Sequence, residues 1–130
     1  GNLIVNFREV FKITFASAVG VEGIRHLIAP DFVTVLVALL GVCVALERLE
    51  HIQLSPEHAL VVYSLSKYVN RKYLISYDDA LTVATQFFNF QNFPQLNKQG
   101  FDYILRDLER MRVIKRYGPD IELLEEVEFN

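Results

Sequence analysis

Residues 108–127, LERMRVIKRYGPDIELLEEV, decide the fold of this chain. An amphipathic helical stripe leads into them, with apolar residues spaced by three, one, three and three: Phe101, Ile104, Leu105, Leu108 and Met111. The stretch then turns at Gly118 and Pro119, and the apolar residues after the turn recur with period two, as in a strand. The sequence therefore predicts a helix that is followed directly by a β-hairpin.

Upstream signals predict two more helices and a short strand. Ser55 and Pro56 supply an N-cap and a first helical residue. The run YLIS at residues 73–76 is apolar and β-like, and Ser76 begins the next helix in a capping-box-like pattern. The segment NFQNFPQLN at residues 89–97 ends this helix. From Ser55 onward the predicted order is helix, short strand, helix, loop, helix, strand, turn, strand.

This order, and the pattern PQLNKQGFDYILRDLERMRVIKRYGPDIEL at residues 94–123, resembles the winged-helix superfamily. In that fold a helix-turn-helix is closed by a β-hairpin called the wing, and the resemblance covers residues 55–129. It implies that the last helix would lie in the major groove of DNA. Arg112 departs from the pattern, because many winged helices end this helix on a Gly, and Arg would cost energy there if its φ is positive. The connection between the second and third helices is also longer than in a tight helix-turn-helix.

Residues 1–54 are expected to form a helical N-terminal segment. Between residues 3 and 18, apolar side chains recur at spacings of three and four and would share one helical face. Residues 32–46, FVTVLVALLGVCVAL, are apolar on every side of a helix, with Asp31 as the expected N-cap and an end near Gln53. Such a helix has to be covered all round. We expect a homodimer interface here, and the alternative is a core helix of a monomer.

The composition is that of a folded protein, with 52% hydrophobic and 22% charged residues among 130. We therefore predict a mainly α fold with a small β-hairpin. It comprises the helical N-terminal segment, which packs or dimerises, and a winged helix-turn-helix domain at residues 55–130. The single cysteine, Cys43, excludes an internal disulfide and agrees with a reducing, cytoplasmic location. The apolar run is shorter than the roughly 20 residues that cross a bilayer, so we expect no membrane contact.

A net charge of −3 gives no overall attraction to nucleic acid, so DNA binding would require a local patch. From Lys98 to Arg116 there are six basic and three acidic residues. Asn and Gln can bridge adenine edges, and Arg or Lys can reach guanine or phosphates. The candidate contact residues for DNA are Asn97, Lys98, Gln99, Tyr103, Arg106, Arg110, Lys115 and Arg116, with Asp102 and Arg112 beside them and Arg71 and Lys72 expected nearby.

Two observations oppose this interpretation. Residues 117–130 contain five acidic residues and no basic one, which disfavours a wing that approaches phosphates. Asp102 and Arg106 are four apart on a helix and could simply pair on a solvated face. The positive balance from Lys98 to Arg116 nevertheless favours a homodimeric transcriptional regulator of winged-helix type that binds double-stranded DNA. The alternative is a winged-helix protein-interaction or assembly module that does not bind DNA and whose partner covers Tyr103.

Enzymatic chemistry has no positive signal in the sequence. Glu47 and His51 could share a helical face, but the histidines lack a metal-ligand spacing. Cys43 lies in the most apolar run, where burial makes a thiol inert. Gly20 and Gly23 lack the basic residue of a phosphate-binding loop. We expect no catalytic residue, no metal site and no cofactor.

Overall fold

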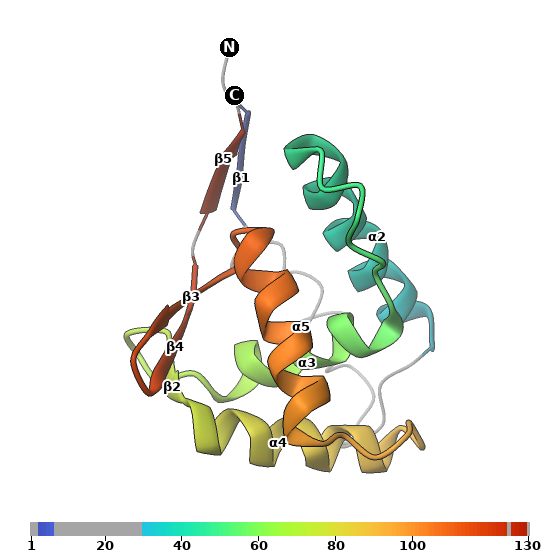
Figure 1. Ribbon diagram of the computed structural model, residues 1–130, viewed down its shortest axis with the longest axis vertical. Coiled ribbons are helices and arrows are strands. Elements are labelled where there is room, and N and C mark those ends of the chain that lie inside the picture. Colours follow the sequence, from blue (N-terminus) through green and yellow to red (C-terminus); the bar gives the residue numbers. More distant parts are fainter. Residues whose placement is uncertain (1–2, 7–29, 125, 130) are drawn as a thin grey trace.

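The computed structural model describes residues 3–6, 30–124 and 126–129, and Figure 1 shows their arrangement. The described chain is mainly helical, with a small three-stranded antiparallel sheet. In chain order the elements are β1 (Leu3–Asn6), α2 (Pro30–Glu47), α3 (Pro56–Tyr68), β2 (Leu74–Ser76), α4 (Tyr77–Phe90), α5 (Lys98–Arg110), β3 (Ile114–Tyr117), β4 (Asp120–Leu123) and β5 (Glu126–Phe129).

The element order predicted from Ser55 onward is confirmed. Strand β4 lies in the centre of the sheet, between β3, its partner in the hairpin, and β2. Pairing of β2 runs from Leu74 opposite Glu122 to Ser76 opposite Asp120. The third strand matters because an isolated hairpin is only marginally stable in water.

Helix α3 is the centre of the core. Every residue from His58 to Leu65 is buried, and α2, α4 and α5 all contact this helix. A helix that is covered on all sides needs apolar residues around its whole circumference. The sequence HALVVYSL is apolar at most of its positions. Its buried Ser64 is satisfied within the helix, donating to the carbonyl oxygen of Leu60 at 2.8 Å.

The helix expected over residues 3–18 is wrong for its first residues. Leu3–Asn6 forms a strand that pairs antiparallel with β5, from Leu3 opposite Phe129 to Asn6 opposite Glu126. Figure 1 shows this ribbon extending from one end of the molecule. Ile and Val accept a strand conformation readily once a partner strand is present, and that partner comes from the other end of the chain. The rest of the predicted helix, residues 7–18, lies outside the described residues.

Helix α2 also differs from expectation at both ends. It begins at Pro30, which puts Asp31 inside the first turn rather than at the N-cap. It ends at Glu47, well before Gln53, because Arg48 takes a left-handed conformation with φ 57°. The amide of Leu49 then donates to the carbonyl oxygen of Val44 at 3.0 Å, which closes the helix as a Schellman motif does.

One side of α2 is covered and another is not. Leu36, Leu40 and Cys43 are buried in the core, whereas Val35, Val42 and Leu46 are 46%, 51% and 41% exposed. The described part of the chain therefore does not cover this helix all round. None of the described helices is both long and apolar enough to cross a membrane.

Candidate nucleic-acid interface

Helix α5 begins with a strong cap. The side chain of Asn97 accepts a hydrogen bond from the amide of Gly100 at 2.7 Å, which satisfies one of the free amides of the first turn. A side chain at position 100 would bring its Cβ to 3.2 Å from the same Asn97 oxygen, so the glycine leaves room for the cap. Asn97, a predicted DNA contact, therefore uses its carboxamide oxygen to start the helix.

The two sides of α5 are separated cleanly. Phe101, Leu105 and Leu108 are fully buried, whereas Tyr103 is 64% exposed. The predicted contact residues of this helix all lie on its exposed side: Lys98, Gln99, Tyr103, Arg106 and Arg110. An open recess of about 490 Å³ runs along this side, lined by Lys98, Gln99, Asp102, Tyr103 and Arg106.

Two of the three acidic residues between Lys98 and Arg116 are at least partly buried, whereas the basic residues are exposed. Asp107 is buried, and its Oδ2 lies 2.8 Å from Nε2 of His58 in α3. Asp102 is half-buried and accepts a hydrogen bond from the hydroxyl of Tyr77, whereas its spacing of four from Arg106 had allowed an ion pair with that residue. Glu109 is exposed, and so are all six basic residues from Lys98 to Arg116. The exposed charged residues from Lys98 to Arg116 are therefore the six basic ones and Glu109, while the half-buried Asp102 still lines the recess along α5.

Tyr77 connects three elements around this surface. Its amide donates to the carbonyl oxygen of Pro119 in the hairpin turn at 2.8 Å. Its ring lies 5.5 Å from that of Phe101 and within 5.8 Å of the Lys98 Nζ and 5.3 Å of the Arg116 Cζ. Burial and the hydrogen bond to Asp102 raise the pKa of the Tyr77 hydroxyl to about 12. The phenol therefore stays neutral and brings one cation of α5 close to one of the hairpin.

Tyr77 was missed in the sequence, where only its place at the start of a helix was evident. It lines a second recess of about 370 Å³ together with Lys98, Arg116, Asp78 and Asp102. Its partner Asp102 is 25 residues further along the chain, so no local pattern could reveal the pair.

The hairpin itself is electrically balanced. Lys115 lies directly opposite Glu122, and its Nζ is 4.9 Å from the ring centre of Tyr117. Residues 114–123 contain two basic and two acidic residues. Glu126 and Glu128, which made the tail strongly acidic, belong to β5 and pair with β1 instead. The acidity of the tail is therefore not concentrated on the hairpin, contrary to expectation.

The C-terminal end of α5 is attached to the end of α2. The guanidinium of Arg110 contacts Nε2 of His51, and Nε of Arg112 lies 3.8 Å from Oε1 of Glu47. Arg112 has φ 61°, in the left-handed region that favours glycine. The arginine that stands where many winged helices have a glycine therefore strains the backbone, as expected.

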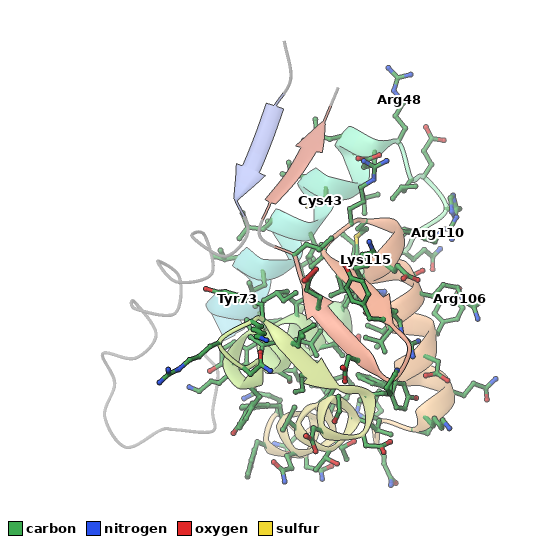
Figure 2. All side chains as sticks on the ribbon, turned by 90° about the vertical axis from the view of Figure 1, so that its left-hand side faces the viewer. Cys43, Arg48, Tyr73, Arg106, Arg110 and Lys115 are labelled. Atoms are coloured by element: carbon green, nitrogen blue, oxygen red, sulfur yellow. The ribbon has the colours of Figure 1, made fainter. Side chains whose placement is uncertain are left out.

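Arg71 and Lys72 are not near α5, contrary to expectation. They precede β2, which is the edge strand opposite β3. Figure 2 shows Tyr73, the next residue, on the other side of the sheet from Arg106 and Arg110.

A second polar arrangement joins α3 to α5. Nδ1 of His58 lies 2.8 Å from Oγ of Ser55 and accepts the Ser55 amide at 3.3 Å, while Nε2 faces Asp107. The order Ser-His-Asp is that of a hydrolytic triad. Here, however, the hydrogen bond that the Ser55 amide donates to Nδ1 gives His58 the place of the Glu in a capping box, and Ser55 lines neither recess. We interpret the three residues as a cap that ties α3 to α5.

Other reactive groups offer no site within the described ranges. No three His, Cys, Asp or Glu side chains there gather as metal ligands would. Burial raises the pKa of the Cys43 thiol to about 12, which keeps it from acting as a nucleophile. His26 lies outside the described residues.

Comparison with known proteins finds no matching family model, no similar curated protein and no similar solved structure. The interpretation of α5 and the hairpin therefore depends on their geometry.

Proposed function

We propose that residues 55–123 act as a winged-helix unit that binds double-stranded DNA through the exposed side of α5, and that the chain regulates transcription. The order of elements from α3 to β4, in which the β3–β4 hairpin follows α5, supports that fold. One observation carries the functional proposal. All six basic side chains from Lys98 to Arg116 are exposed, while Asp102 and Asp107 are engaged by Tyr77 and His58.

The major groove, about 12 Å wide, admits an α-helix. In this proposal Gln99, Tyr103 and Arg106 face the bases, since they lie on the open side of α5. Lys98 and Arg116, which Tyr77 brings together, contact phosphates. Lys115 and Arg110 reach the backbone on either side. The protein would then act in the cytoplasm, where Cys43 stays reduced.

Salt-dependent titration of the full chain with a pool of random-sequence duplexes tests this proposal. The double variant Lys98→Ala/Arg106→Ala should weaken binding by on the order of tenfold or more, and should reduce the slope of log K against log salt by about two. Arg71→Ala/Lys72→Ala is the matched control. It removes the same charge on the far side of the sheet and should leave affinity nearly unchanged.

Two results would contradict the proposal. The first is an unaltered chain that does not bind duplexes at low salt. The second is an equal loss of affinity in the test and control variants, which would mean that net charge, rather than the α5 surface, determines binding.

We further propose that the chain dimerises through α2. Its exposed side carries Val35, Ala38, Val42 and Ala45 at spacings of three and four, the pattern of a helix-pairing seam. A two-fold dimer of this kind would bind best if its α5 helices stood about 34 Å apart, one turn of DNA. Sedimentation of Val42→Glu should then give a monomer where the unaltered chain gives a dimer, with unchanged helical content. A monomeric unaltered chain at micromolar concentration would exclude this interface.

The second candidate function is protein contact without DNA. Tyr103 at 64% exposure and Tyr117 at 47% are large aromatic groups open to solvent beside the arginines, a composition enriched in protein interfaces. If a second copy covers α5, Tyr103→Ala should dissociate the dimer and Val42→Glu should not.

A further inference from the structure

The ends of α2 and α5 form one continuous unit. Arg112 is two residues beyond Arg110, the last residue of α5, and lies near Glu47, the last residue of α2, while Arg110 contacts His51 just beyond α2. Arg48 stands at this junction, with its side chain exposed. Within the described part of the chain it has no hydrogen-bonded or ion-paired partner for its guanidinium.

The backbone at both helix ends is strained. Arg48 and Arg112 have φ 57° and 61°, where glycine would be favoured over any residue with a side chain. The amide of Arg112 donates to the carbonyl of Glu109 and that of Arg48 to the carbonyl of Ala45, so the two helices end in the same way. Strain of this kind suggests that the side chain has a use, because neither helix end needs an arginine for its backbone hydrogen bonds.

The position of Arg48 relative to α5 suggests what that use is. Figure 2 shows Arg106, Arg110 and Arg48 following one another along one edge of the molecule, in the direction in which α5 runs. The helix has 13 residues and is about 20 Å long, whereas the major groove is about 12 Å wide. If the first turns of α5 occupy the groove, its last turn reaches the phosphate backbone, and Arg48 lies beyond that point.

We propose that Arg48 is a phosphate contact, so that the DNA-binding surface continues from α5 onto the end of α2. This inference rests on the proposed function. The partner is the sugar-phosphate backbone of a duplex that already occupies α5, and the contact carries no sequence information of its own. The N-terminal part of the chain would then bind DNA directly as well as pack against residues 55–123.

The experiment measures duplex affinity and its salt dependence for three variants of the full chain. Arg48→Ala removes the positive charge but leaves a residue with a Cβ in the left-handed conformation, so the backbone strain stays the same. We expect it to weaken binding on the order of fivefold, and to reduce the slope of log K against log salt by about one. Arg48→Lys keeps the charge and should restore most of the affinity. Arg71→Ala is the control, because it removes an equal charge across the sheet from α5.

Thermal unfolding separates a binding role from a structural one. Arg48→Gly relieves the backbone strain, so it should raise the midpoint of unfolding while lowering duplex affinity as much as Arg48→Ala does. A merely structural Arg48 would move both quantities in the same direction.

The outcomes distinguish this inference from the function on which it rests. If Lys98→Ala/Arg106→Ala loses affinity while Arg48→Ala binds like the unaltered chain, the contact at Arg48 is excluded and the α5 interface stands. An equal loss in Arg48→Ala and Arg71→Ala would also exclude it. If the unaltered chain binds no duplex, both proposals fail together.

Discussion

Helices α5 and α2 differ in the chemistry of their buried and exposed sides. In α5 the buried and exposed sides differ completely in chemistry, with Phe101 and Leu105 inside and Lys98 and Arg106 outside. In α2 both sides are apolar, and Val42 is 51% exposed while Leu40, two residues earlier, is buried. An amphipathic sequence therefore determines which side of a helix faces the core, whereas a uniformly apolar one determines only that the helix is to be covered.

The sharpest test of this comparison uses two neighbouring aromatic residues of α5. Phe101→Ala should lower the free energy of unfolding by about 3–5 kcal/mol, because the ring is fully buried and leaves a cavity. Tyr103→Ala, on the exposed side, should change it by less than about 0.5 kcal/mol. Urea unfolding of both variants measures the difference. A similar cost for the two would mean that Tyr103 is covered in solution.

The corresponding pair in α2 tests whether its exposed side is free. Leu40→Ala should cost about 2–4 kcal/mol, since this side chain is buried among the core residues. Val42→Ala should cost less than about 0.5 kcal/mol in a monomer and distinctly more in a dimer. Denaturant unfolding at two protein concentrations gives both values. A concentration-independent cost above about 1 kcal/mol for Val42→Ala would show that the chain itself covers this side.

Tyr77 offers a smaller effect on the exposed side of α5. Tyr77→Phe keeps the ring but frees the Asp102 carboxylate beside Lys98, and we expect duplex affinity to fall roughly fivefold, or about 1 kcal/mol. Tyr77→Phe/Asp102→Asn should recover the affinity because it removes the freed charge. If the single variant binds as the unaltered chain does, Tyr77 has no role in arranging this surface.

Tyr77→Phe should also change how the protein titrates at high pH. The pKa of Tyr77 is raised from the usual value near 10 to about 12, so the native state favours the neutral phenol. Its contribution to stability is complete below pH 10 and is lost as the pH rises through 12. Ultraviolet difference titration should show a late phenol ionisation that Tyr77→Phe abolishes.

The smallest expected change concerns the end of α5. Arg112→Gly should raise the free energy of unfolding by about 0.5 kcal/mol, because relief of the positive φ outweighs the entropy of glycine. The ion pair with Glu47 that is lost is long, at 3.8 Å, and its Arg112 side chain is largely exposed, so it contributes little. Thermal unfolding should therefore show a higher midpoint. A lower one would mean that Arg112 makes contacts which outweigh the strain.

Residues 55–123 could be predicted because their signals are local. The stripe from Phe101 to Met111, the turn at Gly118 and the Ser76 cap each specify one element within a few residues. The exposed positions of Lys98, Gln99 and Arg106 followed from the same helical periodicity.

The remaining features depend on partners far apart in the sequence. Asp107 contacts His58, which lies 49 residues earlier in the chain. The local sequence could not indicate that Asp107 is buried, because it resembles any other exposed acid of the helix. The strand at Leu3–Asn6 requires β5, and without it the same residues fit a helical face. Helix α2 ends at a left-handed arginine, Arg48, rather than at a glycine. The sequence therefore predicted an end near Gln53, which is too late.

The pairing of β1 with β5 has a consequence for the order of folding. It joins residues from opposite ends of the chain, whereas β3 and β4 are joined by a two-residue turn. Closing so long a loop costs more entropy and is slower than closing a hairpin, so residues 55–123 should assemble first and the terminal strands should pair last. In native-state hydrogen exchange, the amides of β1 and β5 should open long before those of α3, independently of global unfolding.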